Sequence, residues 1–228
     1  MRKLIYTQTI ILLSFSLTMA CNIDKAAQFY QKGVSNWNSG EIWASLNEVD
    51  KCTDAEAYKL KALSFWRLTV LSFVDESKKD VKANALRTIE NAEALEKIKG
   101  SSELSLALKG MSFQILSSLG VPSAIKNGPK AAEVQAQLEK NYSGKFWTRL
   151  VKGINQLQAP GFAGGNVDSA LVTLQKLNSD FPDSSTVTTY LSLAYSKTKQ
   201  KEKAVQTIDV LIKKEPLNKW AVMVKRTF

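Results

Sequence analysis

The sequence predicts an all-α protein, an α-solenoid of about eleven helices. Two segments near the C-terminus align at a period of 34 residues, so that Ala170 recurs as Ala204 and Pro182 recurs as Pro216. A repeat of this length is typical of stacked helical hairpins, because one hairpin cannot bury its own apolar stripe and must pack on the next. No segment alternates apolar and polar residues convincingly as a β-strand does.

Residues 1–20 are expected to be a signal peptide, since Arg2 and Lys3 precede a short apolar run and small residues before Cys21. The run is too short to span a membrane. Ala20-Cys21 resembles the cleavage site of bacterial lipoproteins, although Thr18 stands where leucine is usual. We expect a lipid on Cys21, because an ordinary signal does not require a cysteine there. The alternative is ordinary cleavage after Ala20.

Lipidation of Cys21 would leave Cys52 without an internal disulfide partner. Cys52 lies in an apolar helical stretch, so it is expected to be a small buried core residue. The alternative is a disulfide between two molecules.

The formal net charge of +10 falls to +8 when residues 1–20 are removed, and the excess is mostly lysine. Specific recognition of phosphates and bases relies on arginine, so no nucleic-acid partner is expected. The basic surface has two interpretations, which are contact with anionic lipid or an envelope polymer, or solubility alone.

Residues 21–124 are expected to form divergent hairpins, and residues 125–228 to form the repeats and a C-terminal capping helix. Thr53-Asp54-Ala55-Glu56 fits a capping box that starts a long helix. A break is expected over 121–129, with Pro129 opening the next helix. The expected helices are 24–37, 41–51, 53–74, 81–99, 102–119, 129–141, 143–157, 167–180, 184–197, 201–214 and one from Asn218.

The unit from Ser185 to Pro216 resembles a tetratricopeptide (TPR) repeat. Its signature residues are Leu191, Tyr195, Ala204, Ile208 and Pro216, and the preceding unit keeps Gly165, Ala170, Leu174 and Pro182. It departs from the pattern at Ser192, at Lys199 where the turn glycine is usual, and at Leu211. The resemblance implies a right-handed α-solenoid of TPR-like hairpins.

Segments 127–131 and 160–165 also resemble a family of exported bacterial TPR-like proteins of unassigned function. This resemblance implies a helical envelope protein that contacts other proteins and has no enzyme activity.

The absence of histidine from the sequence removes histidine triads, the usual zinc sites and most neutral-pH general bases. Two Ser-x-x-Lys matches lack the companion motifs of serine–lysine hydrolases. We therefore expect no catalytic residue, metal or cofactor.

The candidate binding groove comprises four aromatic residues, Trp147, Phe162, Tyr190 and Trp220. Phe162 lies in a loop with Pro160, Gly161, Gly164 and Gly165. It has two interpretations, which are a gate at the rim of the groove or a plug that fills the gap between hairpins.

The predicted function is a non-catalytic scaffold or adaptor of the bacterial cell envelope, whose groove binds a peptide or helix of another envelope protein. The alternative is a small-ligand-binding accessory of an envelope transport system. We expect a lipid-anchored protein that faces the periplasm or lies on the outer membrane, rather than a soluble periplasmic or secreted one. Neither the identity of the partner nor the oligomeric state follows from the sequence.

Overall fold

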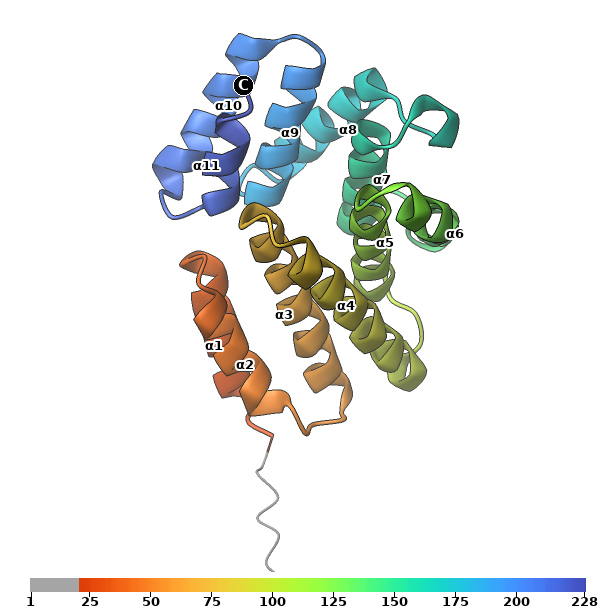
Figure 1. Ribbon diagram of the computed structural model, residues 1–228, viewed down its shortest axis with the longest axis vertical. Coiled ribbons are helices and arrows are strands. Elements are labelled where there is room, and N and C mark those ends of the chain that lie inside the picture. The colour runs from red at the N-terminus through yellow and green to blue at the C-terminus, as the bar shows by residue number, and fades with distance from the viewer. Residues whose placement is uncertain (1–20) are drawn as a thin grey trace, which may run out of the picture.

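The computed structural model describes residues 21–228, so the expected signal peptide lies outside the described part (Figure 1). Over these residues the chain forms eleven α-helices, one short 3-10 helix and no strand. The all-α prediction is confirmed. The helices are α1 (Ile23–Ser35), α2 (Ser39–Val49), α3 (Ala55–Val74), α4 (Lys78–Lys99), α5 (Glu103–Ser118), α6 (Val121–Tyr142), α7 (Phe146–Gln158), α8 (Val167–Asp180), α9 (Ser185–Lys197), α10 (Lys201–Lys214) and α11 (Lys219–Lys225).

The first ten helices pair as five consecutive hairpins, and α11 caps the last one. The first helix of each hairpin also contacts the first helix of the next, so α1, α3, α5, α7, α9 and α11 form one continuous inner layer. This pattern is that of a solenoid, in which each unit contacts mainly its neighbours. The main hydrophobic cluster runs from Ala62 on α3 to Ala194 on α9 without interruption.

The turn inside each hairpin contains a residue with positive φ. Glycine takes this conformation in two turns, at Gly120 and Gly164, because it has no Cβ to clash. The other three turns use Trp37, Glu76 and Lys199. Lys199 has a φ of 62°, so it adopts the left-handed conformation at the place where the repeat pattern has glycine.

The break predicted over 121–129 is wrong, because α6 runs through it with Pro129 inside the helix. Proline removes one backbone hydrogen bond and crowds the carbonyl four residues earlier. That carbonyl belongs to Ile125, and both residues are exposed, so water can solvate the freed oxygen. Pro122 lies in the first turn of α6, where proline is favourable. The boundary expected at 124/125 therefore falls within a helix.

The cap of α3 also differs from the prediction. Asp54, rather than Thr53, is the N-cap, and its carboxylate accepts hydrogen bonds from the backbone N–H groups of Glu56 and Ala57, each at 3.0 Å. An aspartate is at least as good an N-cap as threonine and adds a negative charge at the positive end of the helix dipole.

The path of the hairpins curves until α11 contacts α3, so the last unit returns to the second hairpin (Figure 1). Trp220 on α11 makes this connection. It packs against the main cluster, against the C-terminal cluster, and against the cluster of α1–α3 that contains Leu68 and Leu71. The inner layer is therefore closed at one point by the protein's own C-terminal helix.

Candidate functional site

The two C-terminal repeats superimpose their helix limits at the 34-residue period. Helix α8 spans 167–180 and α10 spans 201–214, and the N-caps Ser184 and Asn218 precede α9 and α11. The signature residues on the helices pack rather than form a site. Ala170, Leu174, Leu191, Ala204 and Ile208 are buried, Tyr195 is partly buried, and Pro182 and Pro216 lie exposed at the turns.

The structure does not gather the four predicted groove aromatics into one site. Tyr190 and Trp220 form an edge-to-face pair with ring centroids 5.0 Å apart, and Tyr190 is 7% exposed. Trp147 instead pairs with Phe146 on α7, at 5.1 Å. The side chain of Phe162 lies outside the described part, so its gate and plug interpretations both stay predictions. Tyr190 and Trp220 are occupied by internal packing, so they do not line an open groove.

Below Trp220, a buried arginine joins the first and last units. The Arg67 guanidinium stacks on the Trp37 ring at 3.7 Å from its centroid and donates a hydrogen bond of 2.7 Å to the Val34 carbonyl. Burial lowers the pKa of Arg67 to about 10, an effect that the charges of Tyr30 and Glu215 oppose. Glu215 precedes α11, so this seam holds charge as well as aromatic contacts between units distant in sequence.

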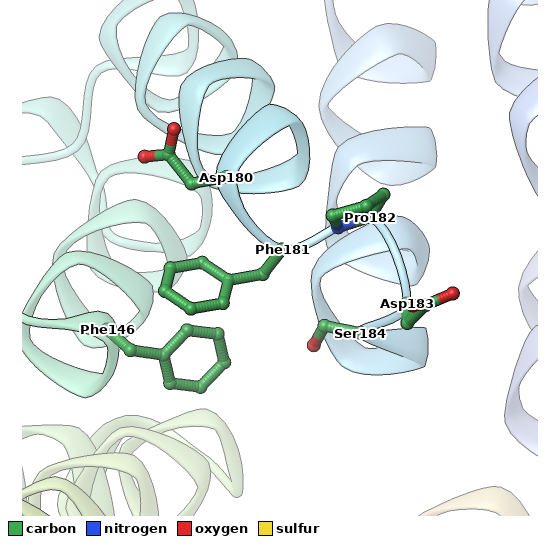
Figure 2. Close-up of a pocket in the computed structure, with 6 residues that line it drawn as sticks. All are labelled: Phe146, Asp180, Phe181, Pro182, Asp183 and Ser184. Atoms are coloured by element: carbon green, nitrogen blue, oxygen red, sulfur yellow. The ribbon is translucent and has the colours of Figure 1, made fainter.

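The most apolar cleft lies where α8 ends and α9 begins, facing the start of α7 (Figure 2). It has a volume of about 470 Å³, and its apolar wall is the edge-to-face pair of Phe146 and Phe181, at 4.8 Å between centroids. Phe181 is 41% exposed. Figure 2 shows the two rings facing each other, with Pro182 beyond them on the connecting segment.

The acidic residues at this cleft already have partners. Asp180 accepts from the Arg149 guanidinium at 2.6 Å, and Asp183 accepts from the Lys214 ammonium at 2.5 Å. Because both carboxylates are paired, the cleft offers apolar surface rather than a free charge. The sequence analysis missed Phe146 and Phe181. The available signal was an aromatic residue directly before the turn proline Pro182.

A second cleft of about 440 Å³ lies between α2 and α4, over the C-terminal half of α3. Polar and charged side chains make up most of its lining, although Trp43 and Leu68 contribute to it. Its floor is bridged by a hydrogen bond of 3.2 Å from the Asn84 amide to the Ser72 hydroxyl. This cleft is less suited than the Phe146–Phe181 cleft to hold an apolar side chain.

The 160–165 loop is shaped by its backbone. Gly161–Ala163 form a turn of 3-10 helix after Pro160, and Gly164 has a φ of 87°. A Cβ added to Gly165 would collide with the backbone oxygen of Ala159, so this position requires glycine. The loop therefore makes a tight reversal between α7 and α8.

Cys21 and Cys52 form a disulfide, with Cα atoms 5.8 Å apart, an ordinary separation for a bridge. The expectation that Cys52 has no internal partner is therefore corrected, although it is buried as expected, at 3% exposed. The hairpin of α1 and α2 brings the residue after α2 back beside the start of α1. A disulfide sulfur cannot also carry a thioether-linked lipid, so the bridge and the lipid are alternative states of Cys21.

Two further properties concern residues 21–228 alone. Within them, no helix combines the length and apolar character needed to cross a membrane. The same residues contain no group of three or more cysteine, aspartate or glutamate side chains placed to hold a metal ion.

Comparison with known proteins identifies one repeat. Residues 189–218 match the tetratricopeptide repeat family, within the unit where the sequence showed the resemblance. No curated protein matches the chain. Among solved structures, the chain is similar to the crystal structure of YrrB, described as a TPR protein with an unusual peptide-binding site. The two share 16% identity with a TM-score of 0.37, over 90% of this chain and 94% of that one.

Proposed function

We propose that this protein is a non-catalytic scaffold or adaptor of the bacterial cell envelope that binds a segment of another envelope protein. The observation that carries the proposal is the Phe146–Phe181 cleft, an exposed aromatic wall between two consecutive hairpins of a TPR-like array. Arrays of this kind present extended surfaces to peptides and helices. The inner face at Tyr190 and Trp220 is filled by α11, so the cleft is the better candidate for the contact.

The chemistry of the cleft suits a large apolar side chain of the partner. Its volume of about 470 Å³ accommodates one or two such side chains. The paired carboxylates of Asp180 and Asp183 form a polar rim that fixes orientation but contributes little binding energy. The partner segment is thus expected to insert an aliphatic or aromatic anchor between the two phenylalanine rings.

Site-specific photo-crosslinking in the native cell tests this contact. A photoreactive amino acid replaces Phe181 in one variant and Val172, which is 66% exposed on α8, in a matched control. We expect one discrete protein adduct from position 181, none from position 172, and loss of the adduct when Phe146→Ala is added. Equal adducts from both positions, or no adduct at 181, would contradict the proposal.

The lipid anchor on Cys21 is a separate part of the proposal, and it is tested by membrane fractionation. Cys21→Ser removes both the lipid and the disulfide, whereas Cys52→Ser removes the disulfide alone. We expect Cys21→Ser to release the protein from membranes and Cys52→Ser to leave it there. If the two variants fractionate alike, Cys21 carries no lipid.

The alternative of a small-ligand accessory requires a sealed apolar pocket near Trp147 and Phe162. Within the described part, the Phe146–Phe181 cleft opens between the exposed residues Phe181 and Pro182. No observation favours this alternative.

A further inference from the structure

The positive charge of the chain is concentrated at its C-terminal end. Residues 197–228 contain nine lysine and arginine residues against three acidic ones, a net charge of +6 out of the +8 carried by residues 21–228. Two of the three acids are already engaged. Asp209 pairs with Lys225 at 2.6 Å, and Glu215 accepts hydrogen bonds from Ser185 and Asn218. The remaining positive charge is therefore largely uncompensated.

Four exposed lysines gather at the turn between α9 and α10, and we call them the turn lysines. They are Lys197, Lys199, Lys201 and Lys203. Within residues 21–228 none of the four forms an ion pair, although Lys197 donates a hydrogen bond to the Leu157 carbonyl and Lys203 donates one to the Gln200 amide oxygen. The other lysine-rich turn, before α4, differs because Lys78 and Lys79 lie among Asp75, Glu76 and Asp80.

The turn lysines lie at the opposite end of the molecule from Cys21. Figure 1 has the longest axis vertical, with the start of α1 at the bottom and the α9–α10 turn at the top. A membrane that holds the lipid of Cys21 would face the bottom end. The turn lysines would then point away from that membrane, so its anionic headgroups would not be their ligand.

We infer that the turn lysines form a docking surface for an acidic segment of a partner protein, rich in aspartate and glutamate. The inference rests on charge complementarity and on the position of the turn at the far end of the long axis. Lysine ammonium groups are flexible, strongly hydrated point charges, which suits a salt-sensitive contact with a run of carboxylates rather than recognition of one planar group. The inference deepens the proposed scaffold function by naming the chemistry of its partner.

The test uses fluorescein-labelled poly-L-glutamate of about 20 residues, with binding to the purified protein followed by fluorescence anisotropy. A triple variant, Lys199→Gln, Lys201→Gln and Lys203→Gln, removes three charges and leaves Lys197 and its hydrogen bond in place. A matched control, Lys78→Gln, Lys79→Gln and Lys82→Gln, removes the same charge at the exposed start of α4. Circular dichroism confirms that both variants keep their helices.

We expect the turn variant to bind poly-glutamate about tenfold more weakly, since each exposed ion pair contributes about two- to threefold. The control should bind within about twofold of the unaltered protein, and added salt should weaken binding. An equal loss in both variants, or no binding of poly-glutamate, would overturn the inference. Binding to phosphatidylglycerol vesicles without binding to poly-glutamate would also overturn it, in favour of a membrane surface.

The cleft and the turn lysines are tested independently. Phe181→Ala should leave poly-glutamate binding unchanged, because Phe181 lies at the other end of α9 from the turn. A failed crosslink at position 181 therefore contradicts the cleft alone, and a failed poly-glutamate test contradicts the acidic partner alone.

Discussion

Replacing Trp220 with alanine should weaken units that lie far apart in the sequence. Trp220 packs against three hydrophobic clusters, and its helix contacts α3 as well as α9 and α10. In most solenoids a change in the last unit affects only its neighbours. Here the closure by α11 predicts that truncation of Trp220 also loosens α3.

The magnitude follows from the burial of the indole. Truncation of a fully buried tryptophan costs about 3–5 kcal/mol. Trp220 is partly buried, so the packing loss is about 2 kcal/mol, and loss of the edge-to-face contact with Tyr190 adds about 1 kcal/mol. A total of about 3 kcal/mol lowers the Tm of a chain of this size by about 6–12 °C.

Thermal unfolding by circular dichroism measures the total loss, and hydrogen exchange locates it. We expect faster exchange of the amides of α3 as well as those of α9–α11, because local opening reports lost contacts. Val210→Ala, at an exposed position on α10, is the control and should change neither measurement. Unchanged exchange in α3, with faster exchange confined to α9–α11, would refute the closure as a stabilising contact.

Two further predictions concern the 160–165 loop and the buried tyrosine. Gly165→Ala should destabilise the fold by about 2 kcal/mol, because the new methyl group meets the backbone oxygen of Ala159; Gly161→Ala, which meets open space, should cost less than about 1 kcal/mol, and equal urea midpoints for the two variants would contradict this. Burial raises the pKa of Tyr190, so its contribution to stability is fully present below pH ~10, the value of a free tyrosine, and is lost as pH rises toward the folded pKa. Ultraviolet titration should show Tyr190 ionising only as the helices unfold, and a Tyr190→Phe variant with fewer tyrosines titrating before unfolding would count against it.

The C-terminal helices were predictable because the period and the caps agree. The limits of α8 and α10 match the expected ranges, since each helix follows a turn and ends shortly before a signature proline. The N-terminal half gave weaker signals. Thr53 and Asp54 are adjacent residues that both suit an N-cap, and the local sequence alone does not choose between them. Pro129 was misjudged because its cost depends on whether the Ile125 carbonyl reaches water, which the tertiary structure decides.

The candidate site was less predictable for a geometric reason. The pairing of Trp220 with Tyr190, and the approach of α11 to α3, depend on the curvature accumulated over all five hairpins. No single repeat encodes that curvature. The Phe146–Phe181 cleft likewise joins two hairpins, so neither phenylalanine is marked within its own repeat unit.

The ion pairs beside that cleft also distinguish the two C-terminal hairpins from each other. Arg149 pairs with Asp180 in the α7–α8 hairpin, and Asp183 pairs with Lys214 in the α9–α10 hairpin. Arg149 and Asp183 occupy equivalent places 34 residues apart, as do Asp180 and Lys214, so the second pair repeats the first with its charges reversed.

An exchange of helices between these similar hairpins, within one molecule or between two, would place Arg149 against Lys214 and Asp180 against Asp183. Mispairing of this kind is a characteristic failure of repeat proteins. The reversed charges therefore act as a check on assembly, since correct partners attract and exchanged partners repel.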